Sequence, residues 1–199
     1  VIFLKDRELA LAVAAAAGWE FRNNPEPRSP VLGAIVMKKS GTELQVDVLR
    51  SVTGLSDVDL AVTESIAFAD GTCYSVLAPD VMLKAKLSNL AGHEQKDRQD
   101  ERHVRILIRC CAHYLIDACA AVRAGVLSER EAVERFMATH RVTTSAKARS
   151  LQHRFNLTLA TAIPPWSSLG DLTPLRRLRS FYEHQVKQAP QTASDGALS

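Results

Sequence analysis

The spacing of apolar residues changes along this chain near residue 79. Before that point, residues 42–49 alternate apolar and polar side chains, which is typical of a half-buried strand, and residues 31–37 are apolar and largely β-branched. The turn-forming residues 38–41 separate these two segments. After residue 79, apolar residues recur every three or four positions, which is typical of amphipathic helices. Strands followed by helices predict an α+β fold.

Composition is consistent with a globular protein of this kind. The chain has 199 residues, of which 46% are hydrophobic and 24% are charged, close to the average for globular proteins. This length allows one sizeable core or two small ones. The longest apolar run, residues 9–17, has about half of the roughly 20 residues that a spanning helix needs. A membrane-spanning chain is therefore excluded at this stage.

The patterns predict three regions. A core with a mixed sheet and flanking helices is expected over residues 1–98, a helical domain over 99–188 and a disordered tail over 189–199, where Pro, Gln, Ser, Gly and Ala dominate. The chain opens on four strand-forming residues, Val1 to Leu4, without an initiator methionine. We therefore expect it to be a fragment of a longer protein.

The cysteines indicate a reducing compartment. Two of the four are adjacent, and their spacing fits neither a disulfide framework nor a zinc site. No charged leader or cleavage site precedes the first apolar residues. We expect a cytoplasmic protein in which the cysteines are buried, reduced thiols: Cys73, Cys110, Cys111 and Cys119.

Two polar positions stand out against these patterns. In the strand 42–49, three apolar side chains share one face, so Asp47 points away from the core. In the helix expected over 80–90, Lys86 lies at the edge of a stripe of three leucines. A loop with two acids, 96–100, follows that helix.

This arrangement resembles the nucleotidyltransferase fold, and more closely the AbiEii-type nucleotidyltransferases of bacterial toxins and phage-defence proteins. The resemblance covers roughly residues 1–115, and its motifs are of moderate specificity. The segments that carry it are Val46-Asp47-Val48-Leu49-Arg50-Ser51-Val52-Thr53-Gly54-Leu55, Val76-Leu77-Ala78-Pro79, Lys86-Leu87 with Asn89-Leu90, and Lys96-Asp97-Arg98-Gln99-Asp100.

The resemblance implies a Mg²⁺-dependent enzyme. In that family, an Asp-x-Asp pair at a strand end and a third acid on a neighbouring strand bind the metal, whose hard oxygen ligands suit this chemistry. Asp47 matches the third position. The Gly-Ser helix start and the Asp-x-Asp pair are expected upstream of Val1, so this chain by itself is expected to be inactive. Lys86 and Asn89 are implied to contact the nucleotide, and Asp97 or Asp100 to orient groups in the site.

The implied reaction transfers a nucleoside monophosphate from a nucleoside triphosphate to an RNA acceptor such as tRNA, or to a protein. A partner antitoxin protein is also implied. Other interpretations of the same residues stay open. A lysine at a stripe edge often extends along apolar surface to reach water, and residues 96–102 fit a solvated helix start with acids near its positive end.

A rival carboxylate pair lies inside the chain. Asp57 and Asp59 have the Asp-x-Asp spacing, but a strand rather than a Gly-Ser helix precedes them. The alternative is a helix cap with acids in the first turn. The six histidines are scattered, and none has the i, i+4 spacing of a metal-binding helix. We expect packing or surface roles for them.

The C-terminal part is basic. Residues 141–187 hold eight basic residues against two acidic ones, and the densest basic positions are Arg176, Arg177 and Arg179. Such a segment is suited to RNA or another polyanion, although an ordinary charged helical face has the same composition. The alternative function is therefore a non-catalytic module that binds RNA or protein.

Overall fold

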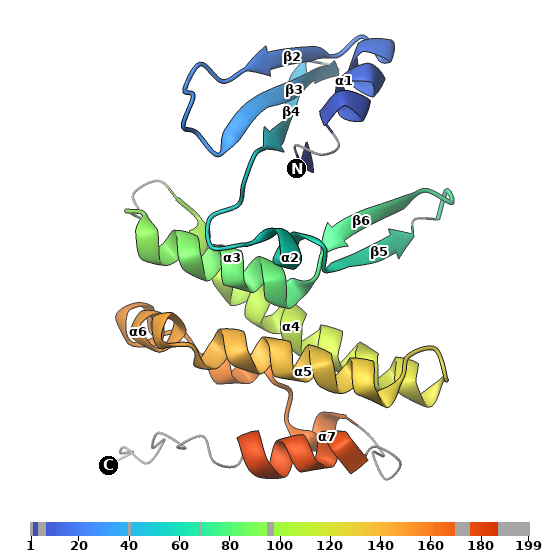
Figure 1. The fold of residues 1–199 in the computed structure, drawn as a ribbon, viewed down its shortest axis with the longest axis vertical. Coiled ribbons are helices and arrows are strands. Elements are labelled where there is room, and N and C mark those ends of the chain that lie inside the picture. Colours follow the sequence, from blue (N-terminus) through green and yellow to red (C-terminus); the bar gives the residue numbers. More distant parts are fainter. Residues whose placement is uncertain are drawn as a thin grey trace. The chain divides into compact units, whose positions relative to one another are not determined.

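The structure, a computed structural model, describes residues 2–3, 7–39, 41–67, 69–94, 98–169 and 176–186 (Figure 1). Strands and helices are both present, so the α+β class predicted from the sequence is confirmed. The chain divides into two units, Val1–Thr63 and Glu64–Ser199. The expected tail, 189–199, and Asp97 lie outside the described residues.

The first unit is built on a four-stranded sheet. Its strands have the order β1-β4-β3-β2, with β1 parallel to β4 and the other pairs antiparallel. Figure 1 shows β2, β3 and β4 side by side. The elements of this unit are β1 (Ile2–Phe3), α1 (Arg7–Ala16), β2 (Glu20–Asn23), β3 (Val31–Lys39), β4 (Thr42–Leu49) and α2 (Asp57–Leu60).

One face of this sheet is apolar. Ala14 of α1 packs with Ile35 of β3 and Val48 of β4, and the partly buried Phe21 and Val46 lie against them. Because side chains alternate along a strand, the other face of β4 carries Glu43, Gln45 and Asp47. The prediction that Asp47 points away from the core is confirmed.

Gly33 allows β2 to approach β3. The residue lies at an irregularity in the pairing of β3 with β4 and pairs with Asn23 of β2. A Cβ atom at Gly33 would lie 2.5 Å from the carbonyl oxygen of Arg22 and 2.6 Å from the Phe21 ring. A side chain therefore cannot be added here unless the backbone moves.

The second unit begins with a strand pair and continues as helices. Its elements are β5 (Thr63–Ala67), β6 (Cys73–Leu77), α3 (Pro79–Gly92), α4 (Asp100–Arg123), α5 (Glu129–Thr144), α6 (Ala146–Phe155), the 3₁₀ helices η2 (Leu159–Ala162) and η3 (Trp166–Ser168), α7 (Arg176–Phe181) and η4 (Tyr182–Val186), which is a π-helix. Ser128 and Glu131 have the Ser-x-x-Glu spacing that predicts a helix start, and they form a capping box at the start of α5.

Two apolar clusters hold these helices together. The first joins leucines of α3 to α4, α6 and η2, and includes Leu83, Leu90, Leu107 and Leu159. The second surrounds Phe136, which has no exposed surface. α3 belongs to the second unit, and its apolar stripe is buried against α4.

Two local expectations need correction. The sequence pattern predicts one helix over about 144–162, with Pro164 and Pro165 beyond it, but α6 ends at Phe155, where Asn156 adopts a left-handed conformation with φ +48° and closes the helix. All four cysteines are free, yet only Cys111 and Cys119 are buried, while Cys73 and Cys110 are exposed. Cys110 and Cys111 differ because adjacent positions on a helix point about 100° apart.

No helix in the described ranges is long and apolar enough to cross a membrane.

Candidate functional site

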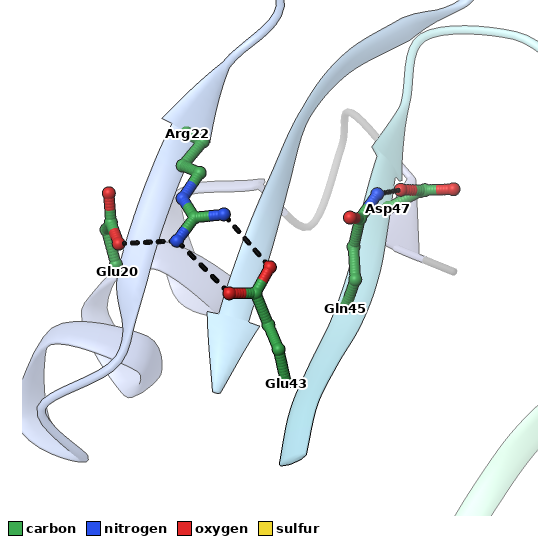
Figure 2. A network of polar contacts seen from close by, with 5 residues as sticks. All are labelled: Glu20, Arg22, Glu43, Gln45 and Asp47. Atoms are coloured by element: carbon green, nitrogen blue, oxygen red, sulfur yellow. Dashed lines mark hydrogen bonds and ion pairs between the residues drawn. The ribbon is translucent and has the colours of Figure 1, made fainter. Parts of the chain in front are cut away.

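Asp47 lies near the end of β4, on the face of the sheet opposite α1 (Figure 2). Its Oδ1 accepts a hydrogen bond of 2.7 Å from Nε2 of Gln45, two residues earlier on the same face. The residue is half-buried, and β1 runs parallel to the same strand, with Ile2 opposite Val48. Asp47 thus presents a carboxylate, held by a neutral donor, next to a parallel strand.

A network of charges occupies the far side of the same face (Figure 2). Nη1 of Arg22 donates to Glu43 Oε1 at 3.0 Å, and Nη2 donates to Glu20 Oε2 at 3.1 Å. The hydrogen bond from Arg22 lowers the pKa of Glu20. The sequence analysis did not identify this network, because its members lie on β2 and β4, which β3 separates, and the sequence does not specify how these strands pair. The network engages Glu43 through Arg22. Among the described acids of this face, Asp47 is therefore the one whose hydrogen bond comes from a neutral side chain.

Lys86 of α3 meets Asp100 at the start of α4. The Lys86 Nζ lies 3.0 Å from Asp100 Oδ1, and the Arg98 Nε lies 2.6 Å from Asp100 Oδ2. The Asp100 side chain is 3% exposed, against 30% for Lys86 and 40% for Arg98. Burial would raise the pKa of Asp100, but the hydrogen bonds from Arg98 and Lys86 outweigh it and hold the pKa below its usual value.

Asn89 lies three residues after Lys86 on α3, so the two share a side of the helix. Asn89 is half-buried, and its backbone carbonyl accepts the N–H of His93 at 3.0 Å. Asp97, the third candidate for catalysis, lies outside the described residues. Of the acids in the loop 96–100, the structure therefore describes Asp100, which the sequence analysis gave as the alternative to Asp97.

The rival pair, Asp57 and Asp59, is not a strand. It forms the first turn of α2, with Ser56 as the N-cap. The Asp59 carboxylate accepts from the backbone N of Ser56 at 2.8 Å and from its hydroxyl at 2.6 Å, which completes a capping box. The helix-cap interpretation of this pair is thus the one that the structure bears out.

The basic positions of α7 make contacts within the second unit. The backbone N of Arg177 donates to Glu129 Oε1 at 2.6 Å, and the Arg179 Nε donates to Glu183 Oε1 at 3.1 Å. Both side chains are exposed. Arg176 begins the helix, and its side chain lies outside what the structure describes. Whether these arginines bind nucleic acid stays a prediction.

A further polar cluster joins three elements of the second unit. The Tyr114 hydroxyl of α4 donates to Glu64 Oε1 of β5 at 2.6 Å, and the Arg135 Nη2 of α5 lies 3.0 Å from the same oxygen. The Arg135 guanidinium also lies over the Tyr114 ring, 4.7 Å from its centroid. Sequence analysis missed this cluster, since its members are far apart in the chain and lack a common motif.

Asp80 of α3 is the buried acid of this region. Asp80 is 6% exposed, and burial raises its pKa. The negative charge of Glu64 raises this pKa further, whereas hydrogen bonds from backbone N–H groups and the charge of Arg135 lower it. A carboxyl with a raised pKa in the folded state weakens folding once it ionises. The penalty is absent below the unfolded pKa of about 3.9 and is complete above the folded pKa.

We therefore expect Asp80→Asn to stabilise the protein at neutral pH and to lose this advantage in acid. Urea unfolding of both proteins at several pH values between about 3 and 8 measures it. The difference in unfolding free energy should grow as pH rises through the carboxyl range. If the unfolding free energy of the variant relative to the wild type were instead lower at pH 7 than at pH 3, ionised Asp80 would be stabilising the fold.

The candidate residues fall in both units. Asp47 belongs to the first unit, and Lys86, Asn89 and Asp100 belong to the second. Within the described ranges, no group of three or more His, Cys, Asp or Glu side chains is placed to hold a metal ion. Comparisons with protein-family models, with curated proteins and with solved structures found no match for this chain.

Proposed function

We propose that this chain is part of a nucleotidyltransferase-like protein, which transfers a nucleoside monophosphate from a nucleoside triphosphate to an RNA or protein acceptor. The observation that carries the proposal is the position of Asp47, on the face of β4 opposite the apolar cluster with α1 and beside the parallel strand β1. The AbiEii-type enzymes that the sequence resembles need a carboxylate on the strand next to the one that carries their Asp-x-Asp pair.

The strand pairing supports this role for Asp47. β1 and β4 are parallel, so both strands end at the same edge of the sheet. Ile2 lies opposite Val48, the residue that directly follows Asp47. A carboxylate on the strand that leads into Ile2 would therefore be a neighbour of Asp47, provided that it faced the same side.

The donor chemistry of Asp47 is of the kind that Mg²⁺ takes. Its carboxylate oxygens are hard ligands, and only Oδ1 is engaged by Gln45 in the described structure. A divalent metal in such a site neutralises triphosphate charge during attack at the α-phosphorus. The described residues supply one carboxylate on this face near β1, which is fewer than a metal centre needs. We accordingly propose Asp47 as one of several carboxylate ligands that together bind the metal ion.

Lys86 and Asn89 are proposed to bind the phosphates of the nucleotide. The ammonium group of Lys86 is held at 3.0 Å by a buried carboxylate and is still 30% exposed, so it is both oriented and accessible. A positioned cation stabilises negative charge that develops on a reacting phosphate. Asp100, which holds Lys86, is proposed to orient it.

The test is metal-dependent transfer by the protein encoded by the whole reading frame. The protein is incubated with each labelled nucleoside triphosphate, with Mg²⁺ or with a chelator, and with total RNA or total protein as acceptor. We expect label in an acceptor with Mg²⁺ and a return to background with the chelator. Absence of label from every combination would contradict transfer and favour the binding module.

The exposed face of α4 is the observation that favours this second candidate. Arg102 and Arg109 are exposed at a spacing of seven residues, and His113 continues the same face one turn later. Arg105 also lies there, but its guanidinium pairs with Glu101 at 2.8 Å. A binding module would use such a face for a polyanion, and its affinity would fall steeply with salt.

A further inference from the structure

Two cations converge on one carboxylate at the start of α4. Lys86 approaches Oδ1 of Asp100 and Arg98 approaches Oδ2, so each oxygen has its own charged donor. The two donors come from different segments, one from α3 and one from the residues just before α4. Both bonds are charge-assisted, which is the strongest class of hydrogen bond in proteins.

The charge that remains is positive and faces solvent. Asp100 is covered, while about a third of each cationic side chain is exposed. Two positive groups against one negative group leave a net positive charge, and the negative member is the buried one. Because a buried carboxylate fixes both cations, they are held in place before any ligand arrives. The first backbone N–H groups of α4 add a partial positive charge at the same place.

Arg98 retains donors for a further acceptor. Among the described contacts, it engages Asp100 through Nε, and no described residue accepts from its two terminal nitrogens. A guanidinium has five N–H donors in a planar arrangement that suits phosphate oxygens. Lys86 has three donors, one of which points to Asp100. The pair can therefore bind an anion with several oxygens without losing its contacts to Asp100.

We propose that Arg98 is a second phosphate-binding residue, which together with Lys86 binds the phosphate chain of a nucleoside triphosphate. The proposal rests on the proposed function for the identity of the ligand. Its new element is Arg98, a residue that neither the sequence patterns nor the resemblance singled out. Asp100 holds one cation at each of its two oxygens, so both cations are available to oxygens of one phosphate chain.

The direct test is binding of inorganic triphosphate to the chain, without metal, by titration calorimetry at constant ionic strength. We expect the Arg98→Ala variant to bind about tenfold more weakly, since a hydrogen bond to a charged group contributes about 1.5–3 kcal/mol and tenfold corresponds to about 1.4 kcal/mol. The triphosphate affinity of Arg98→Lys should lie between those of the wild type and Arg98→Ala. The matched control is Arg130→Ala, at an arginine in the first turn of α5 whose side chain is 77% exposed, which should change the affinity less than twofold.

Three results would overturn the inference. These are undetectable triphosphate binding by the wild type, unchanged binding by Arg98→Ala, or equal weakening by Arg98→Ala and Arg130→Ala, which would indicate a diffuse charge effect. Circular dichroism of each variant verifies that it is folded.

The transfer assay separates this inference from the proposed function. If Arg98→Ala transfers nucleotide with an unchanged KM for the triphosphate, the inference fails and the proposed function stands. If triphosphate binding depends on Arg98 but no transfer occurs, the anion site stands and the transferase proposal fails.

Discussion

Nucleotide transfer by the whole protein is expected to fall on the order of 10³-fold when Asp47 is replaced by Asn. The substitution keeps the shape of the side chain and removes its negative charge. A metal ligand contributes several kcal/mol of charge stabilisation in the transition state, and each 1.4 kcal/mol corresponds to a tenfold change in rate. The initial rate of label incorporation at saturating triphosphate measures the effect.

The matched control is Glu43→Gln, which removes an acid from the same strand and the same face of the sheet. Glu43 pairs with Arg22 on the surface, so its loss should cost less than about 1 kcal/mol and leave transfer unchanged. Thermal unfolding provides the second readout. If Asp47→Asn melts far below the wild type, or if both variants lose activity equally, Asp47 is a structural residue.

Phe136→Ala is expected to have the largest effect on stability. Phe136 has no exposed surface, and its ring meets those of Phe181 and Tyr182 edge-on, at centroid distances of 5.9 and 5.8 Å. Truncation of a buried Phe to Ala costs about 3–5 kcal/mol, because both the transfer free energy and the filled volume are lost. That is a large part of the 5–15 kcal/mol by which a typical domain is stable.

Urea unfolding followed by circular dichroism at 222 nm measures this loss, because most helices belong to the second unit. Phe136→Leu keeps most of the side-chain volume, so it provides a folded variant of intermediate stability if the alanine variant does not fold. The control is Val126→Ala, at a side chain that is 81% exposed, which should change the unfolding free energy by less than about 0.5 kcal/mol. A cost below about 1 kcal/mol at Phe136 would mean that α5 and α7 do not share a core.

Local periodicity accounts for what the sequence predicted correctly. Alternation along β4 placed Asp47 and Val48 on opposite faces of the sheet, and helical spacing placed Lys86 beside the leucines of α3. Both depend only on the geometry of one element. The cap at Ser128 was predictable for the same reason, since its partner is three residues away.

Features that depend on distant partners were not predictable. β5 has a single half-buried residue, Glu64, whose partners Tyr114 and Arg135 lie on two helices much later in the chain. The pairing of Lys86 with Asp100 depends on α3 packing against α4. Asn156 ended α6 early through a backbone conformation that helical propensity does not encode.

The adjacent thiols of α4, Cys110 and Cys111, differ in their access to solvent, so their modification rates report on opening of the core. Burial raises the pKa of Cys111, so this thiol is both covered and poorly ionised, whereas the neighbouring Cys110 is exposed to solvent. A thiol reagent modifies Cys110 at the rate of the free reaction, but it reaches Cys111 only when the helix separates from its neighbours. The ratio of the two rates therefore reads out how often this core opens, from two consecutive residues of a single chain.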